Sequence, residues 1–252
     1  MKSRKWRWLL LAGALLMSGC AVYNGTSTDI PLFQEKGEWQ VETAFVPVPL
    51  PLGIPVPIPI LAIPFRGTVS HSLTDRIGLS VGADALRQNV QAMGGIYTPV
   101  NDHFVWELYG GMVLGRGEKS NLEAPYGYSG HYMMPFVQID CGWRDLTRWM
   151  HLDVAFALRA GGIYGETRYS YPYRNELTVN NYYTPKMFFH GVRPLLEPSM
   201  EIRFGWERLK FNIRYYQIFI LGNGSDRPYN LRDIPTLQGG IGLGVSYRFG
   251  GR

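Results

Sequence analysis

Two histidines, His131 and His190, are the residues of this sequence best suited to acid–base chemistry, because an imidazole titrates near neutral pH. A hydrolase needs such a base together with an orienting carboxylate and a nucleophile or water within hydrogen-bond reach. The possible companions beside the same long connections are Glu166, Glu176, Ser129 and Ser170. Their spacing matches no such constellation, so we do not expect an enzyme. A hydrolase at the rim of the fold stays as an alternative.

Metal and nucleotide chemistry find less support. No close spacing of His, Cys and carboxylates is typical of a zinc or calcium site. The glycine-rich stretch 239–244 lies inside an expected strand with no helix after it, and a nucleotide-binding loop requires that helix. We therefore expect no metal and no cofactor other than a covalent lipid.

The lipid is expected on Cys20. The chain begins with four basic residues among its first eight, followed by an apolar run from Leu9 to Met17 and the small residues Ser18 and Gly19. This pattern predicts a signal peptide over 1–19, because nine apolar residues are too few to span a bilayer as a helix. The second cysteine, Cys141, would then have no disulfide partner.

The stretch 16–20 resembles a bacterial lipobox, in which a large apolar residue and two small ones precede the cysteine that receives lipid. An ordinary signal peptide that happens to contain a cysteine is the alternative.

The expected organisation is a lipoprotein signal peptide at 1–19, a lipidated periplasmic tether at 20–36 and an outer-membrane barrel at 37–252. Four of the basic residues are removed with the signal peptide, so the net charge falls from +5 to +1. Nothing in that charge favours a nucleic-acid partner.

After the predicted signal peptide, apolar residues alternate with small or polar ones with a period of two. This pattern predicts strands whose two faces meet different surroundings. In the last segment, apolar side chains at Ile241, Leu243 and Val245 alternate with glycines and Ser246. A soluble sandwich would alternate as well, so strand length and turn length must decide. We expect about ten strands (8 to 12) at 37–46, 60–73, 76–87, 89–99, 103–115, 131–144, 148–161, 192–206, 208–221 and 236–249.

Most of these strands reach the ~9 to 11 residues that a tilted transmembrane strand requires. The connections alternate between tight turns and long segments, which is typical of outer-membrane barrels. We therefore predict an all-β fold: an antiparallel transmembrane β-barrel with short periplasmic turns and long extracellular loops. The five tryptophans expected at its short-turn end are Trp39, Trp106, Trp143, Trp149 and Trp206. The expected location is the outer membrane of a Gram-negative bacterium, with a lipid anchor and a periplasmic N-terminus.

Cys20, with Tyr23 nearby and Pro31-Leu32-Phe33-Gln34-Glu35-Lys36-Gly37-Glu38 leading into the first strand, resembles a group of outer-membrane β-barrel lipoproteins from Bacteroidota-type bacteria. The resemblance covers the tether and the general strand layout. It implies a location in the cell envelope and no activity that could be carried over.

Alternate residues of each strand face opposite sides of the barrel wall. If the apolar set faces lipid, the other set, which is a mixture of charged and polar side chains, faces the barrel interior. A barrel of this size is close to the size that side chains fill, so we expect a hydrogen-bonded plug made of the barrel's own residues. A narrow channel for small solutes is the alternative. The residues expected inside are Gln40, Glu42, Arg66, Thr68, Ser70, Asp84, Glu107, Tyr109, Gln138, Asp140, Arg144, His151, Asp153, Arg159, Glu201, Arg203, Lys210, Asn212, Arg214 and Arg248.

Two long segments could contact partners. A tyrosine-rich loop at 162–190 could be a recognition surface, or a cap packed on the barrel mouth, through Tyr164, Tyr169, Tyr171, Tyr173, Tyr182 and Tyr183. An apolar segment is expected to form a hairpin with prolines on one edge only, a pair of polyproline II arms being the alternative. Its residues are Val46, Pro47, Val48, Pro49, Leu50, Pro51, Leu52, Gly53, Ile54, Pro55, Val56, Pro57, Ile58 and Pro59.

The function expected from all this is structural or interactive. The chain would be a lipoprotein barrel that displays surface loops or serves as an accessory subunit of an envelope complex. Its expected partners are outer-membrane lipid and another membrane protein, bound through the 46–60 hairpin or the loop 162–190. The narrow channel and the rim hydrolase are the two alternatives.

Overall fold

The computed structural model describes residues 28–45, 66–85, 88–120, 127–172, 182–183, 192–221 and 237–251. Within these residues the fold is all-β, and none of them forms a helix that could cross a membrane. The strands are β1 (Glu38–Phe45), β2 (Arg66–Ser72), β3 (Ile77–Asp84), β4 (Asn89–Pro99), β5 (Phe104–Ser120), β6 (Gly127–Trp143), β7 (Asp153–Pro172), β8 (Tyr182–Tyr183), β9 (Val192–Gly205), β10 (Leu209–Ile220) and β11 (Leu237–Gly250).

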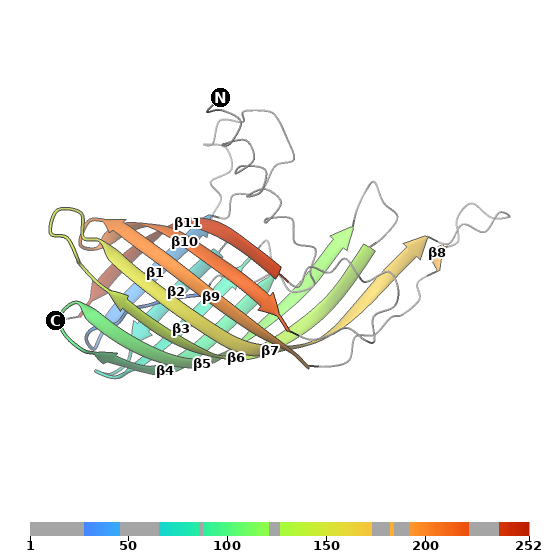
Figure 1. The fold of residues 1–252 in the computed structure, drawn as a ribbon, viewed down its shortest axis with the longest axis horizontal. Helices are drawn as coiled ribbons and strands as arrows, with labels where there is room; N and C mark the ends of the chain where they lie inside the picture. Colours follow the sequence, from blue (N-terminus) through green and yellow to red (C-terminus); the bar gives the residue numbers. More distant parts are fainter. Residues whose placement is uncertain are drawn as a thin grey trace, which may run out of the picture.

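Ten of these strands form one closed antiparallel barrel (Figure 1). Each strand pairs with its neighbours in sequence, β1 pairs with β11, and β7 pairs with both β6 and β9. The two-residue β8 pairs only with the far end of β7. The predicted barrel of about ten strands is therefore confirmed, and β4 has the predicted bounds.

Three strands extend past the bounds predicted for them. β5 and β6 continue to pair as far as Ser120 and Gly127, and β7 reaches Pro172. The predicted strand ends at 115 and 131 are therefore wrong, and so is the predicted loop 162–190 for residues 162–172 and 182–183, which belong to strands. Backbone pairing needs no apolar alternation, and these extensions carry little of it. In Figure 1 they project beyond the rest of the barrel wall.

β7 begins at Asp153 and not at residue 148, because residues 144–152 form a wider turn than expected. Asp145 and His151 have positive φ angles of 52° and 40°, and the Leu146 amide donates to the Leu152 carbonyl at 2.8 Å. A left-handed conformation at two positions reverses the chain before the strand starts. Trp149 lies in this turn, largely exposed.

The two ends of the barrel differ in their connections. One end, here called the short-turn end, carries the connections 73–76, 100–103, 144–152 and 206–208 together with the start of β1 and the end of β11. The opposite, long-loop end carries the long connections 46–65, 173–191 and 221–236, together with the shorter connections 85–88 and 121–126. The predicted asymmetry of short and long connections is present in the fold.

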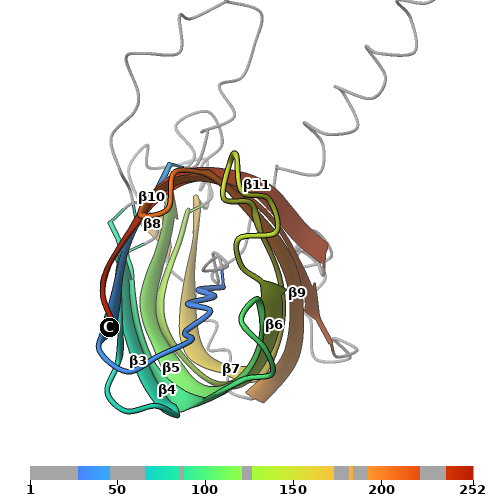
Figure 2. The same cartoon turned by 90° about the vertical axis from the view of Figure 1, so that its left-hand side faces the viewer.

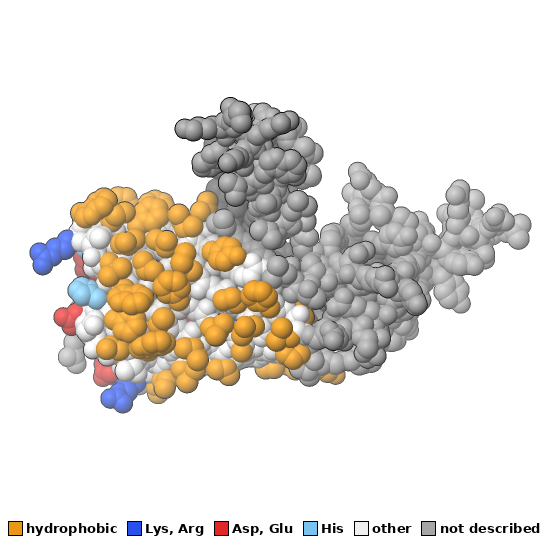
Figure 3. Space-filling model, viewed as in Figure 1, with side chains coloured by type: hydrophobic (Ala, Val, Ile, Leu, Met, Phe, Trp, Pro, Cys, Tyr) orange, Lys and Arg blue, Asp and Glu red, His pale blue; other side chains and the backbone are white. Residues whose placement is uncertain are grey.

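The outer wall of the barrel is apolar. Outward-facing residues such as Leu79, Val81 and Leu108 are exposed, while their neighbours along each strand are buried. In the view of Figure 3, hydrophobic side chains cover the described wall and charged ones gather at the short-turn edge. The five tryptophans lie at or near that end, as the sequence predicts, and Phe104 contacts both Trp106 and Trp143 there.

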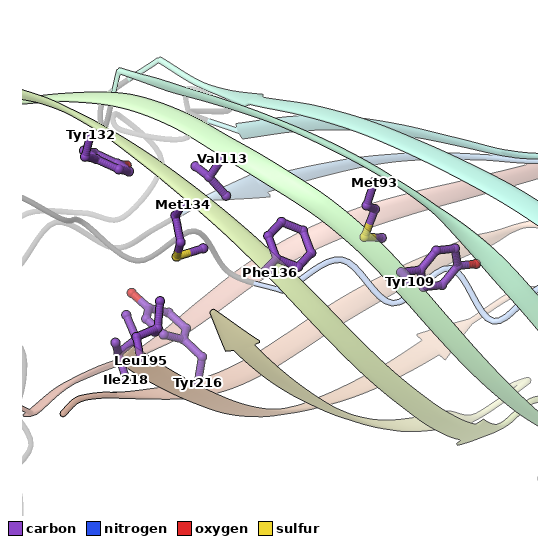
Figure 4. Packing of buried hydrophobic residues seen from close by; sticks show 9 residues of the cluster. All are labelled: Met93, Tyr109, Val113, Tyr132, Met134, Phe136, Leu195, Tyr216 and Ile218. Atoms are coloured by element: carbon purple, nitrogen blue, oxygen red, sulfur yellow. The ribbon is translucent and has the colours of Figure 1, made fainter. Parts of the chain in front are cut away.

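The interior, or lumen, receives the side chains that the sequence predicts. Of the twenty residues expected inside, all are buried except two: Arg248 is half-buried, and His151 is half-buried in the turn before β7. The half nearer the long loops differs from the expectation of a polar interior. A buried apolar cluster lies there between several strands, made of Met93, Tyr109, Val113, Tyr132, Met134, Phe136, Leu195, Tyr216 and Ile218 (Figure 4).

Candidate functional site: the segment inside the lumen

The first described residues of the chain, which precede β1, lie inside the barrel. Viewed from the short-turn end, the blue segment before β1 lies within the ring of strands (Figure 2). Residues 28–35, here called the lumen segment, are buried up to Phe33, with Ile30, Leu32 and Phe33 at 0 to 1% exposed. The sequence led us to expect a tether at 20–36 joining the lipid to the barrel, and the described part of it instead fills the lumen.

The lumen segment is fixed to the wall at the short-turn end. The Gln34 side chain donates to the Asp102 carbonyl at 2.7 Å, in the turn between β4 and β5. The Ser72 hydroxyl, at the end of β2, donates to the Glu35 carbonyl at 2.6 Å. The chain therefore leaves the lumen at a defined position, between the end of β2 and the turn that joins β4 to β5.

Glu107 of β5 holds two consecutive backbone amides of the segment. The Leu32 and Phe33 N–H groups donate to its two carboxylate oxygens at 3.0 and 2.8 Å. The Tyr109 hydroxyl donates to the same carboxylate at 3.3 Å. Two backbone amides and one hydroxyl thus converge on a single buried carboxyl group, which makes Glu107 a strong point of attachment.

Two glycines in the wall make room for the apolar side chains of the segment. A Cβ atom on Gly78 would stand 2.7 Å from the Phe33 ring, and one on Gly142 would stand 2.7 Å from a Leu32 methyl group. Phe33 also packs on Tyr97, with ring centroids 5.6 Å apart. Because real Cβ contacts are longer than this, wall and segment fit each other only with glycine at both positions.

Farther into the lumen, Asp29 is surrounded by wall residues from several strands. Its carboxylate accepts from the Arg66 guanidinium at 2.6 Å, from the Thr68 hydroxyl at 3.0 Å and from the Gln91 side chain. The Asp29 carbonyl accepts from Gln138 at 2.6 Å. The carboxylate thus links β2 and β4, and the backbone of the same residue adds β6.

Arginines of the wall donate to the carbonyl groups of the segment. Arg203 donates to Ile30, Arg248 to Pro31 at 3.2 Å, and Arg144 to Leu32 at 3.1 Å. A buried carbonyl without a partner costs free energy, and these guanidinium groups supply the partners. Three consecutive carbonyls of an irregular segment are satisfied in this way.

Arg203 also belongs to a network of ion pairs that crosses the lumen. Arg214 contacts Glu42 at 2.6 Å and Glu201 at 2.7 Å, and Arg203 contacts Glu201 at 2.9 Å. Nearer the short turns, Lys210 contacts Asp153 at 2.6 Å. Charges of both signs alternate, so the network presents no field of a single sign to a passing ion.

The turn at residues 144–152 continues this network outside the strands. The Asp145 carboxylate accepts from Lys210 at 3.0 Å and lies 3.2 Å from His151 Nδ1. Partial burial alone would raise the pKa of Asp145, but the Lys210 ammonium, helped by Arg144 and His151, holds that pKa below its usual range. The turn thus carries a stabilised carboxylate at the edge of the lumen.

Five of the six tyrosines expected in a recognition loop lie in strands. Tyr164, Tyr169 and Tyr171 belong to β7, and Tyr182 and Tyr183 form β8, where Tyr183 pairs with Tyr171. Tyr164 faces outward and is half-exposed. Tyr173 lies outside the described residues, as do Cys20 and the apolar proline segment 46–60.

One pair of the rim residues considered for hydrolysis comes together. His131 of β6 stands opposite Glu166 of β7 in the strand register, and opposite Arg116 of β5 on its other side. His131 faces away from the lumen, and His190 and Glu176 lie outside the described residues. Among the residues the structure does describe, no group of three or more His, Cys, Asp or Glu side chains is arranged to hold a metal ion.

Sequence reasoning identified the wall of this site and missed its occupant. The signal for the occupant was weak: Ile30, Leu32 and Phe33 are apolar side chains in a stretch expected to be a solvated tether. No protein-family model matches the chain, and no curated protein matches it either. The function is therefore argued from the geometry of the barrel and its lumen.

Proposed function

We propose that this chain is an outer-membrane lipoprotein of a Gram-negative cell envelope, whose closed barrel has a structural or interaction role. The observation that carries the proposal is the combination of an apolar outer wall with a lumen filled by the chain's own residues 28–35. An apolar wall over a closed barrel suits a lipid bilayer, and a filled lumen suits a barrel that supports other parts of the envelope.

The height of the apolar wall supports the membrane placement. Outward-facing rows of β5, β6 and β7 run from Trp106, Cys141 and Phe156 up to Leu114, Met133 and Tyr164. These rows are eight residues apart on each strand. At a rise of about 3.3 Å per residue and a tilt of about 40°, they span roughly 20 Å, close to the ~25 Å apolar band of outer-membrane barrels.

Polar residues begin directly beyond this band. The next outward-facing row toward the long loops contains Arg116 and His131, and Glu166 stands opposite His131 in the strand register. At the opposite edge lie the tryptophans, which favour a membrane–water interface. We place the two interfaces at these rows, with lipid on Cys20 as the second attachment to the membrane. The organisation is then the signal peptide, tether and barrel of the Bacteroidota-type group that the sequence resembles.

The projecting ends of β5, β6 and β7 are the part of the barrel best placed to meet a partner. They continue past the polar row and past the other strands (Figure 1). We propose that this projection, together with the segment 46–60, is where an envelope protein binds. The barrel would be the accessory subunit that holds the projection at the membrane surface.

Site-specific photocrosslinking tests this role. A photoreactive amino acid in place of Tyr171, in the projection of β7, is expected to give a discrete protein adduct in native membranes. The same substitution at Tyr215, an exposed tyrosine in the middle of β10, is the matched control and should give none. Absence of any adduct at Tyr171, Tyr169 and Tyr183 in a chain that is present in the outer membrane would contradict the interaction role.

A further inference from the structure

The lumen segment runs along the barrel from one end toward the other. Gly37 is bonded to Ser72 at the short-turn end, with the Gly37 N–H donating to the Ser72 carbonyl at 3.0 Å. Thr28, at the other end of the segment, donates to Glu197 at 3.4 Å. Glu197 lies eight residues from the short-turn end of β9, which corresponds to a climb of about 20 Å.

Asp29 shows the same direction on the opposite wall. Its ion-pair partner Arg66 is the first residue of β2, at the end of that strand nearer the long loops. Its partner Arg214 lies in the middle of β10, 3.9 Å away. The first described residues of the chain therefore lie beyond the middle of the barrel, on the side of the long loops.

We infer that the lumen segment directs the preceding chain toward the long-loop end, so that Cys20 and its lipid leave the barrel by that mouth. The anchor would then lie in the outward-facing leaflet. This inference rests on the proposed function, since it takes the barrel to be in the outer membrane and Cys20 to be acylated. It reverses the sequence-based expectation of a periplasmic N-terminus.

The return route toward the short-turn end is blocked by the segment itself. To turn back, the residues before Thr28 would have to pass the level of Ile30, Leu32 and Phe33, which fill the lumen together with Tyr97 and Val105. They would also have to pass the ion pairs around Arg203 and Glu201, both completely buried. A second backbone at that level would need hydrogen-bond partners of its own and would separate these charges.

The route toward the long loops suits the sequence that takes it. Residues 20–27, Cys-Ala-Val-Tyr-Asn-Gly-Thr-Ser, carry no charged side chain. The wall on that side changes from ion pairs to the apolar cluster around Val113, Met134 and Ile218 (Figure 4). An uncharged chain can lie against apolar side chains without burying an unpaired charge.

The length of this stretch also suffices. Eight residue steps join Cys20 to Thr28, and a fully extended chain covers about 3.3 Å per step, or about 26 Å. Glu197 lies five residues from the end of β9 at the long loops, a climb of about 13 Å. After this climb, about 13 Å of the extended reach is left. A barrel of ten tilted strands spaced by about 4.8 Å has a radius of about 10 Å, so the lipid can reach the bilayer beside the barrel.

The test places an epitope tag between Ala21 and Val22 of the full, lipidated chain and probes it with antibody on intact cells. Orientation is measured in parallel with single cysteines in a Cys141→Ser chain, using a maleimide that does not cross membranes. Ala85→Cys reports the link between β3 and β4 at the long-loop end. Asp75→Cys reports the turn between β2 and β3 at the short-turn end. Both positions are exposed.

The expected result is that the tag and Ala85→Cys are accessible on intact cells, whereas Asp75→Cys reacts only after permeabilisation. A tag that is reached only after permeabilisation or denaturation, with the two cysteines behaving as expected, overturns the inference and leaves the proposed function standing. Cysteines that do not differ in accessibility contradict the proposed membrane placement, and the inference fails with it.

A pair of variants tests whether the lumen contacts direct the chain. Asp29→Ala combined with Glu107→Ala removes the carboxylates that hold the segment, and we expect the antibody signal on intact cells to fall about tenfold or more. Gly242→Ala is the control, because its added Cβ meets nothing within 4 Å, and it should leave the signal unchanged. Labelling of Ala85→Cys in the same chains verifies that the barrel has assembled. An unchanged signal in the double variant would overturn the role of these contacts.

Discussion

Single carboxylates decide how the irregular parts of this chain are held. Glu107 accepts from two neighbouring amides at once, and Asp29 joins residues of separate strands. Each binds or belongs to a stretch of chain that has no regular strand pairing, and its hydrogen bonds take the place of that pairing. Asp145 does the same in the turn before β7, but at the edge of the barrel where solvent has access. The contribution of the Asp145 charge to the stability of the barrel can therefore be measured by changing the pH.

Asp145→Asn should lower the stability of the barrel by about 1 kcal/mol or less at pH 7, because Lys210 keeps its contact with Asp153 and solvent screens the site. Asparagine tolerates the left-handed backbone, so the loss reports the charge. The pKa of Asp145 is lower in the folded chain than in the unfolded chain. The stabilisation is thus present above the unfolded pKa and disappears as pH falls through the folded one.

Urea unfolding of both chains in detergent, measured from pH 7 down to pH 3, tests this. The difference between wild type and Asp145→Asn should shrink toward zero at the acid end. A difference that stays constant over this range would show that the carboxylate charge is not the cause.

At the scale of elements, the strands were predictable and the lumen segment was not. Alternation located β4 at its observed bounds because one face of each strand meets apolar surroundings and the other meets the ion-pair network. The lumen segment has no such period, and its partners lie far along the chain: Asp29 pairs with Arg66 and Arg214. Contacts of this kind leave no local pattern, so only the unexpected apolar residues in the supposed tether indicated them.

The apolar cluster in the half of the lumen nearer the long loops was missed for a different reason. Its residues, among them Met93, Val113 and Met134, have apolar neighbours on the outward face as well. Where both faces are apolar, alternation cannot tell the inner face from the outer one. The extensions of β5 to β7 were missed because hairpin pairing continues there without an apolar stripe.

The fit between wall and segment predicts the effect of Gly78→Ala. The added Cβ would stand 2.7 Å from the Phe33 ring, so the ring or the strand must move, at a cost of about 1 to 3 kcal/mol. Amide hydrogen exchange should rise in residues 28–35 and change little in β9 and β10. Gly242→Ala is the control, because a Cβ on this inward-facing glycine meets nothing within 4 Å. Equal exchange in both variants would show that Phe33 is not seated against Gly78.

At the scale of the whole molecule, the barrel has an outside suited to lipid and an inside suited to its own chain. The wall supplies arginines, and the segment supplies Asp29 and a row of carbonyl oxygens as their acceptors. Neither part is complete alone, since removing the segment leaves Glu107 without the two amides that it binds. The contacts that fill the lumen are thus the same contacts that, in the topology proposed above, direct the N-terminal anchor.

A barrel sealed in this way should not conduct. We expect the wild-type chain in planar bilayers to show no ion current, whereas a chain with residues 28–35 replaced by eight alternating Gly and Ser residues should show one. The replacement removes Ile30, Leu32 and Phe33 from the lumen, and water then solvates the charged side chains that line it, such as Glu107 and Arg66. Gly242→Ala, which alters the wall without touching the segment, should stay silent. A conducting wild type would contradict the seal, and a silent replacement chain with intact strands would show that the wall closes without the segment.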